Sequence, residues 1–301
     1  MNADAGFRCG TVVIAGRPNV GKSTLLNALV GQKLSIVTHK AQTTRHRIQG
    51  IVTEPGFQMI LVDTPGAGAP AGSRLSHAMS REAAAGVAAA DAALLIVAAP
   101  RWRPEDDVVL RQLKSSGCPI VLAVNKIDRV RPRTRLLPLL ERAAEKHGFA
   151  AIVPISAERR ENLDRLAAAL VALLPEAPPV YPAEQVTDRS ERFLAAEVLR
   201  EQLMLALSDE LPYGIAVEIE RFEATPDGRT EIDAVIWVER VGQRKIVIGA
   251  NGARLKAIGQ ATRLALNEMF GRRIHLKTWV KVREGWTDDD QLLRRLGHDA
   301  S

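Results

Sequence analysis

The first residues that could do chemistry form a short run near the amino end of the chain, Gly16-Arg17-Pro18-Asn19-Val20-Gly21-Lys22-Ser23. The run has the spacing G-x-x-x-x-G-K-[ST] and lies between an expected strand (10–15) and an expected helix (22–30). Glycines let backbone N–H groups approach phosphate oxygens, and the helix N-terminus adds its positive end. We therefore predict a phosphate cradle, in which Lys22 is a catalytic group on the β- and γ-phosphates and Ser23 ligates Mg²⁺.

A second motif, Asp63-Thr64-Pro65-Gly66-Ala67, follows an apolar strand expected over 57–62. Asp63 is placed to hold Mg²⁺ through water, and the Gly66 N–H is placed to meet a γ-phosphate and to move when it leaves. Many such enzymes carry a glutamine that orients the attacking water where this chain has Ala67. We infer that backbone, a cation such as K⁺ near Asn19, or a bound partner positions the water, and that intrinsic hydrolysis is slow.

The segment between these motifs contains Gln42-Thr43-Thr44-Arg45. A hydroxyl in such a segment can cap Mg²⁺ when the γ-phosphate is present. Because the two threonines are adjacent, the assignment between them stays open. We favour Thr44 as the metal ligand and as part of the catalytic set.

A base-recognition motif, Asn125-Lys126-Ile127-Asp128, follows an apolar strand expected over 120–124. The Asp128 carboxylate can accept from guanine N1–H and the exocyclic amine, whereas adenine offers neither donor there. Asn125 is expected to tie this loop to the phosphate loop, and the Lys126 stem to cover the base. Ser156-Ala157, after another apolar run, is predicted to supply a backbone N–H to guanine O6. The nucleotide is therefore predicted to be GTP or GDP.

Length and composition set limits on these interpretations. A chain of 301 residues favours two domains, and 46% hydrophobic with 25% charged residues is typical of globular proteins. The formal net charge of +6 suggests a polyanionic partner. The two cysteines have no metal-like spacing, and the first eight residues have no apolar core, so we expect a protein of the reducing cytoplasm without a secretory signal.

The order of elements predicts two domains of different class. Strand-like and helix-like runs alternate over 8–174, which predicts an α/β P-loop domain with a mostly parallel sheet and helices on both faces. Glu54-Pro55-Gly56 reads as the turn of an antiparallel hairpin. A Pro-rich linker is expected over 175–190, a smaller α+β domain over 191–285 and a polar tail over 286–301.

The second domain carries a G-x-x-G loop, which we expect between a strand and a helix over 253–270. Two glycines let the backbone approach sugar-phosphate, with the helix N-terminus behind them. Between residues 240 and 283 there are eleven basic residues and one acid, Glu268. We therefore predict that this segment binds single-stranded RNA. The residues expected to contact RNA are Arg244, Lys245, Ile248, Gly249, Ala250, Asn251, Gly252, Arg254 and Lys256.

In the order and the amino-acid sequence of its motifs, the chain resembles the Era family of bacterial GTPases. Besides the phosphate loop, the resemblance includes residues 40–47, 187–193 and 248–259 and runs nearly end to end. It implies a GTPase domain followed by a type II KH domain, binding near the 3′ region of 16S rRNA, and assistance to small ribosomal subunit assembly. It also implies loose association with the inner face of the membrane, and we expect a monomer.

Other functions remain open at this stage. The chain could be an RNA-binding assembly factor in which GTP binding, and not hydrolysis, carries the role. A tRNA-modification or ribosome GTPase with another cargo is less favoured, because the sequence shows neither a second GTPase domain nor a C-terminal cysteine for chemistry. A small-molecule kinase is disfavoured because the motif at 125–128 selects guanine.

Overall fold

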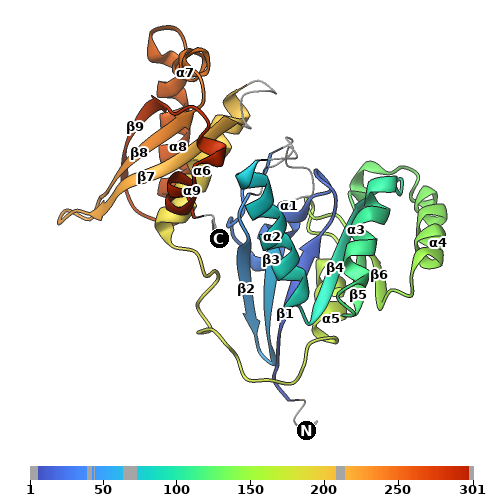
Figure 1. Cartoon of the computed structure of the whole chain (residues 1–301). Coiled ribbons are helices and arrows are strands. Elements are labelled where there is room, and N and C mark those ends of the chain that lie inside the picture. Colours follow the sequence, from blue (N-terminus) through green and yellow to red (C-terminus); the bar gives the residue numbers. More distant parts are fainter. Residues whose placement is uncertain (1–5, 39–42, 44, 64–72, 208–213, 298–301) are drawn as a thin grey trace. The chain divides into compact units, whose positions relative to one another are not determined.

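The computed structural model describes residues 6–38, 43, 45–63, 73–207 and 214–297 (Figure 1). By its contacts the chain divides into two compact units. The first unit holds the described residues of 1–35, 44–69 and 80–188, and the second holds those of 36–43, 70–79 and 189–301.

The elements of the amino-terminal half alternate between strands and helices. They are β1 (Arg8–Ala15), α1 (Lys22–Val30), β2 (Ile48–Glu54), β3 (Phe57–Asp63), α2 (Arg74–Ala88), β4 (Ala92–Ala98), α3 (Pro104–Lys114), β5 (Ile120–Asn125), α4 (Leu137–Lys146), β6 (Ala151–Pro154) and α5 (Leu163–Val171). The later elements are α6 (Glu191–Ala206), β7 (Ile215–Ala224), β8 (Thr230–Val238), α7 (Val241–Ile248), α8 (Ala253–Phe270), β9 (Ile274–Val282) and α9 (Asp290–Arg295).

The first unit is built on a six-stranded sheet in the order β2-β3-β1-β4-β5-β6. Only β2 and β3 are antiparallel, joined by the turn at Gly56, whose φ is 95°. The expected hairpin is therefore confirmed. The other strand pairs are parallel, so the carboxyl ends of β1, β3, β5 and β6 lie along one edge of the sheet. That edge is where open α/β sheets bind ligands.

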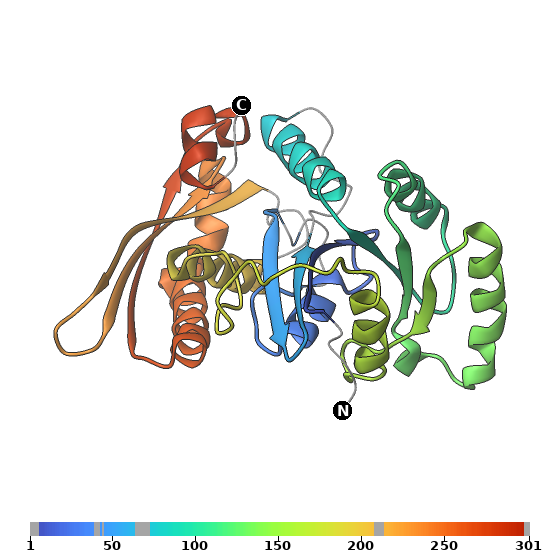
Figure 2. The same cartoon turned by 90° about the horizontal axis from the view of Figure 1, so that it is seen from below.

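The central strands β4 and β5 are buried along their whole length, as expected for a sheet covered on both faces. Side chains of β1, β4 and β5 form one apolar cluster with residues of α3 and α4. Figure 2 shows α3 and α4 in green on one face of the sheet, and α1 in blue and α5 in yellow-green on the other. This covering holds the strand ends rigidly in place.

The Pro-rich segment is bound to the first unit along the edge of its sheet. We call residues 175–188 the strap. Ile51 N–H of the edge strand β2 donates to Val186 O at 2.9 Å, and Thr187 Oγ donates to Gln49 O at 2.7 Å. The sequence predicts a semi-rigid linker here, whereas the structure shows a segment that pairs with β2.

One buried side chain anchors the middle of the strap. Gln58 in β3 is fully buried, and its Oε1 accepts from the N–H groups of Val180 and Tyr181 at 2.8 and 2.9 Å. Its Nε2 donates to Tyr181 O at 2.8 Å and to Thr53 Oγ at 3.0 Å. The side chain thereby satisfies a stretch of backbone that proline-rich sequence cannot pair by itself.

The second unit packs helices against a three-stranded sheet in the order β7-β8-β9. Strands β7 and β8 are antiparallel, and β8 and β9 are parallel. Side chains of α6 and α8 form one core cluster with the buried face of this sheet. In β9 the side chains alternate, with Ile274 and Val280 buried and Lys277 and Trp279 exposed. No helix in the described part of the chain is both long and apolar enough to cross a membrane.

The element before the G-x-x-G loop is a helix, α7, and the expectation of a strand there is wrong. The β-branched run 246–248 favours a strand by propensity, but capping and packing decide otherwise. Gln243 Oε1 accepts from the N–H groups of Glu239 and Arg240 at 2.9 and 3.0 Å, which starts the helix. Only Val247 of α7 is buried.

A 3₁₀ turn (Arg133–Leu136) precedes α4, which starts at Leu137 because Pro138 fits only a first helical turn. One further expectation also fails. The segment expected as a polar tail instead packs into the second unit. Trp286 is 1% exposed and donates to Gly214 O at 3.0 Å, and α9 follows it. A few well-spaced apolar residues suffice to order an otherwise charged segment.

We predict that Gln58→Ala releases the middle of the strap. Three backbone groups of the strap would lose their partners, so the free energy of unfolding should fall by about 2 kcal/mol, and amide exchange at 180–181 should accelerate. Chemical denaturation and hydrogen exchange measure both. The control is Gln185→Ala, because the Gln185 side chain donates to Thr187 O within the strap, at 3.0 Å, and has no other hydrogen bond among the described residues. Equal effects of the two variants would contradict the anchoring role of Gln58.

Candidate functional site

The phosphate loop joins β1 to α1. At two of its positions only glycine fits. A Cβ at Gly16 would lie 2.6 Å from Ile96 O, and a Cβ at Gly21 would lie 2.5 Å from Asn125 Nδ2. Gly21 also has φ 103°, in the left-handed region. Close packing therefore requires both glycines of the motif, and the backbone conformation at Gly21 requires glycine as well.

Lys22 lies beneath the loop as the first residue of α1. Its Nζ donates to Gly16 O at 2.9 Å and to Arg17 O at 3.2 Å, and the side chain is buried. Burial lowers the pKa of Lys22, the nearby Asp63 raises it, and the Arg17 guanidinium lowers it. An anionic phosphate in the cradle would stabilise the ammonium form, so nucleotide binding and protonation of Lys22 favour each other.

The residues expected at the metal come together at the ends of β3 and the loop. Ser23 Oγ donates to Asp63 Oδ2 at 3.0 Å, and Asp63 is fully buried at the last position of β3. A hydroxyl and a carboxylate side by side, next to a phosphate cradle, fit the hard oxygen ligands that Mg²⁺ takes. These two side chains are thus suited to hold Mg²⁺ on a bound nucleotide.

Sequence reasoning missed a further pair that supports Asp63. Ser35 Oγ donates to Asp63 Oδ2 at 3.2 Å, and Ser35 is fully buried. Asn27 of α1 fixes Ser35, since its Oδ1 accepts from the N–H groups of Leu34 and Ser35 at 2.9 Å each. No motif marks these residues, because each one acts through another residue of the first unit.

The base-recognition loop follows β5 and is joined to the phosphate loop by one amide. Asn125 Nδ2 donates to Val20 O at 2.8 Å, and its Oδ1 accepts from the N–H groups of Lys126 and Ala157 at 2.8 and 3.0 Å. Lys126 Nζ donates to Asn19 O at 2.5 Å. Burial lowers the pKa of Lys126, and the nearby Arg129 and Arg17 lower it further.

A serine orients the Asp128 carboxylate, which the sequence predicts to read guanine. Ser156 Oγ donates to Asp128 Oδ1 at 2.7 Å, and Ser156 is itself fully buried after β6. The sequence predicts only a backbone role for the 156–157 pair. In the structure the Ser156 hydroxyl donates to Asp128 and the Ala157 amide donates to Asn125, so this pair also positions the loop predicted to read the base. Ile127 is buried beneath the loop.

Several residues of the predicted site lie outside the described residues. They are Thr44, Thr64, Pro65, Gly66 and Ala67. The choice between Thr43 and Thr44 as metal ligand, and the role of Gly66, stay predictions.

The G-x-x-G loop connects α7 to α8 by a tight turn. Gly249, Asn251 and Gly252 have φ of 74°, 50° and 75°, and a Cβ at Gly249 would lie 2.7 Å from Arg254 Cβ. Arg254 Nη1 donates to Ile246 O at 2.6 Å and closes the turn. No side chain caps the N-terminus of the 18-residue α8, so its first N–H groups are directed outward behind the loop.

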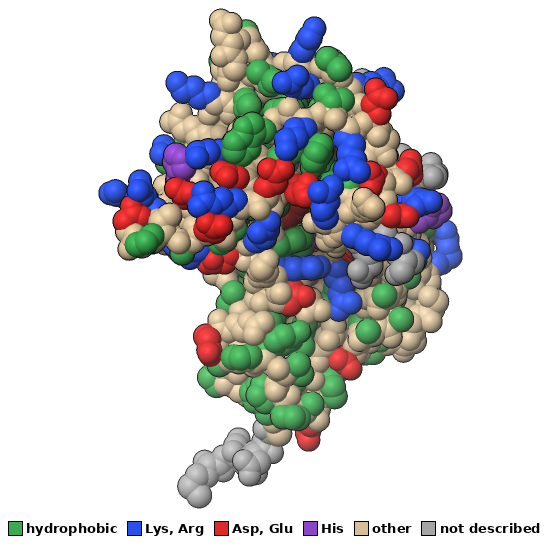
Figure 3. All heavy atoms as spheres, turned by 60° about the vertical axis from the view of Figure 1, so that its left-hand side comes forward, with side chains coloured by type: hydrophobic (Ala, Val, Ile, Leu, Met, Phe, Trp, Pro, Cys, Tyr) green, Lys and Arg blue, Asp and Glu red, His purple; other side chains and the backbone are tan. Residues whose placement is uncertain are grey.

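The structure separates the basic residues of the second unit into two sets. Some basic side chains of β9 and its neighbours form ion pairs, as in Lys281–Glu220 at 3.0 Å and Arg272–Glu191. Figure 3 shows basic and acidic side chains interspersed on this unit, which is the upper part of the view. No ion pair is found within the described chain for those nearest the loop, namely Arg244, Lys245, Arg254 and Lys256. Cations without an ion pair in the described residues are therefore present beside the loop.

Comparison with known proteins decides what these sites belong to. One family model, 50S ribosome-binding GTPase, matches residues 11–126, and another, KH domain, matches residues 210–287. The GTPase Era of Stenotrophomonas maltophilia strain K279a is 50% identical over 300 residues, which cover 99% of this chain and 100% of that protein. The chain belongs to the Era family of GTPases. The GTPase Era of Xanthomonas axonopodis pv. citri strain 306 is also 50% identical, over 97% of each chain.

Solved structures of Era proteins have the same fold. A variant of Aquifex aeolicus Era bound to GDP·AlF4⁻ has a TM-score of 0.93 at 37% identity and covers 97% of this chain and 99% of its own. A structure of Era with MgGDPNP and nucleotides 1506–1542 of 16S ribosomal RNA has the same score and coverage at 38% identity. The P-loop GTPase fold, the KH domain and GTP hydrolysis are thereby confirmed.

We predict that Ser156→Ala weakens guanine-nucleotide binding. Loss of a hydrogen bond to a charged group should reduce GDP affinity about tenfold or more, because Asp128 loses the contact that orients it. Titration with a fluorescent GDP analogue measures this. Ser116→Ala is the control, since that hydroxyl donates only to Leu113 O at 2.7 Å and approaches Cys118. Unchanged affinity in Ser156→Ala would show that Asp128 needs no such support.

Proposed function

We propose that this chain is a GTP-dependent switch that binds the 3′ region of 16S rRNA and assists assembly of the small ribosomal subunit. The observation that carries the proposal is the α7–α8 turn, with its uncapped helix N-terminus and unpaired cations, on a chain that also holds a guanine site. The rRNA complex of a family member at 38% identity supports the choice of RNA.

In this proposal the nucleotide residues divide the work. Gly16 and Gly21 let the backbone surround the phosphates, Lys22 places a cation against them, and Asp128 with Ser156 reads guanine. Ser23 and Asp63 hold Mg²⁺, which supplies charge neutralisation on the phosphates. The presence of MgGDPNP in the Era–rRNA structure supports Mg²⁺ as the metal.

RNA binding in this proposal uses the loop backbone and the cations beside it. The left-handed residues at 249, 251 and 252 turn the chain so that sugar-phosphate can approach without a side chain between. Exposed Ile246 and Val241, which are 42% and 58% exposed, offer apolar surface for unstacked bases. Phosphate contacts from Arg244, Lys245 and Lys256 would add affinity that falls with salt.

Further features of the proposal come from the resemblance alone. We propose peripheral contact with the inner membrane surface, a cytoplasmic location and a monomeric state. We also propose K⁺ as an activator beside Asn19, because Ala67 has no polar side chain to orient water and Asn19 is exposed in the phosphate loop with φ 63°.

We predict that Ala250→Asp abolishes RNA binding while the chain stays folded. Ala250 is exposed in the G-x-x-G loop, so an added carboxylate would repel sugar-phosphate and weaken binding at least about tenfold. The measurement is binding, and stimulation of GTP turnover, by a short RNA that copies the 16S rRNA 3′ end. A scrambled RNA is the sequence control.

The control variant is Lys277→Gln, which changes the net charge by the same amount. Lys277 is exposed on the sheet face opposite to α8. Lys277→Gln should retain RNA binding. Equal losses in the two variants would show that net charge, and not the loop, carries the affinity.

We predict that GTP turnover is several-fold faster in potassium than in sodium buffer at equal ionic strength. The chain has Ala67 where many such enzymes carry a glutamine that orients the attacking water. A K⁺ ion in the phosphate loop would instead supply a positive charge beside the reacting phosphate. Phosphate release measured in the two buffers tests this. Equal rates would remove K⁺ from the mechanism.

A further inference from the structure

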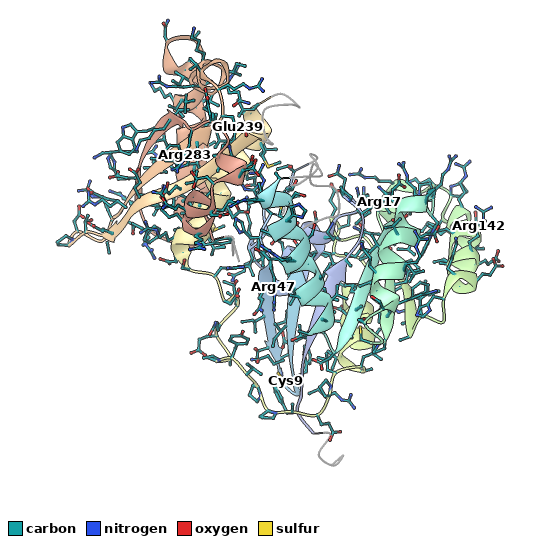
Figure 4. All side chains as sticks on the ribbon, in the orientation of Figure 1. Cys9, Arg17, Arg47, Arg142, Glu239 and Arg283 are labelled. Carbon is teal, nitrogen blue, oxygen red and sulfur yellow. The ribbon has the colours of Figure 1, made fainter. Side chains whose placement is uncertain are left out.

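The phosphate loop has an anchor that belongs to neither nucleotide motif. Arg17 Nε lies 3.2 Å from Asp106 Oδ1, and the two side chains are 16% and 0% exposed. Figure 4 labels Arg17, which lies beside the beginning of α3. Asp106 stands in the first turn of that helix, 89 positions along the chain from Arg17 (106 minus 17).

Asp106 differs from an ordinary helix-capping acid in its burial. Its Oδ2 accepts from Arg103 N–H at 2.9 Å, which serves the cap. Its Oδ1 is buried and forms no hydrogen bond within the described chain, and faces Arg17. Burial raises the pKa of Asp106, while the Arg103 N–H and the Arg17 guanidinium lower it. A carboxylate in this position is little stabilised by water. It therefore stabilises a cation that it contacts, which here is Arg17.

Arg17 passes this restraint to the catalytic lysine. It follows Gly16, which packs against Ile96 O of β4, and its own carbonyl accepts from Lys22 Nζ at 3.2 Å. Fixing the Arg17 side chain therefore fixes the first peptide of the loop and an acceptor that holds Lys22. The second half of the loop is held separately, since Asn19 O and Val20 O accept from the base-recognition loop.

We propose that Asp106 is a positioning residue of the GTPase site, which holds the first half of the phosphate loop through Arg17. The base-recognition loop holds the second half and itself contacts the nucleotide. Asp106 belongs to α3, and its carboxylate accepts from the helix start and faces Arg17, so it orders the cradle independently of the base. A loop fixed in advance loses less conformational freedom when phosphate binds.

The test uses the full chain with Asp106→Asn and Arg17→Gln, alone and together. Asp106→Asn keeps the shape of the side chain, and its amide oxygen can still accept from the Arg103 N–H. The substitution removes a buried charge, and Arg17 can then turn toward water. Both variants should therefore fold, which circular dichroism verifies. We expect each single variant to bind a fluorescent GDP analogue about tenfold more weakly and to hydrolyse GTP more slowly. The double variant should be no weaker than the weaker single variant.

The matched control is Asp107→Asn, one position along the same helix. Asp107 of α3 pairs with Lys146 of α4 at 2.9 Å, and both side chains are partly exposed. This ion pair therefore does not involve the phosphate loop. This variant should bind and hydrolyse as the unmodified chain does. Additive losses in the double variant, unchanged GDP affinity in Asp106→Asn, or tighter binding because a released Arg17 reaches the phosphates would each overturn the proposal.

Discussion

The side-chain amide of Asn125 is the junction on which the nucleotide site depends. It bonds to the loop after β1, to the loop after β5 and to the backbone after β6, and it is 2% exposed. These three segments follow three parallel strands of one sheet, and the Asn125 amide bonds to all three. Because the amide is buried, its bonds are not exchanged with water, and the distance between the phosphate and base subsites is fixed by the protein.

The sequence was sufficient to predict where the residues expected to act directly on the ligand lie in the fold. Lys22, Asp63, Asn125 and Asp128 are found at the expected strand and helix ends because parallel strands bring their carboxyl ends together. The supporting residues could not be predicted. Ser156 and Asp128 are 28 positions apart, and their contact depends on the relative height of β5 and β6, which no local pattern encodes.

The second unit shows where local propensity is overridden. The run Ile246-Val247-Ile248 favours a strand, yet α7 forms because Gln243 caps its start and one apolar face suffices for burial. The terminal segment reads as polar by composition, yet Trp286 with Leu292 and Leu293 buries it. The two predictions fail for the same reason. A short element is stabilised by the tertiary contacts of only a minority of its residues, which local patterns do not reveal.

The strap has a consequence for how this protein behaves among other chains. A parallel sheet with two open edges presents rows of unpaired N–H and C=O groups, which invite a strand from a second molecule. Here the strap occupies the outer side of β2, and the opposite edge is the four-residue β6, which ends in Pro154. The segment that leads toward the RNA-binding unit thus also closes the sheet against aggregation.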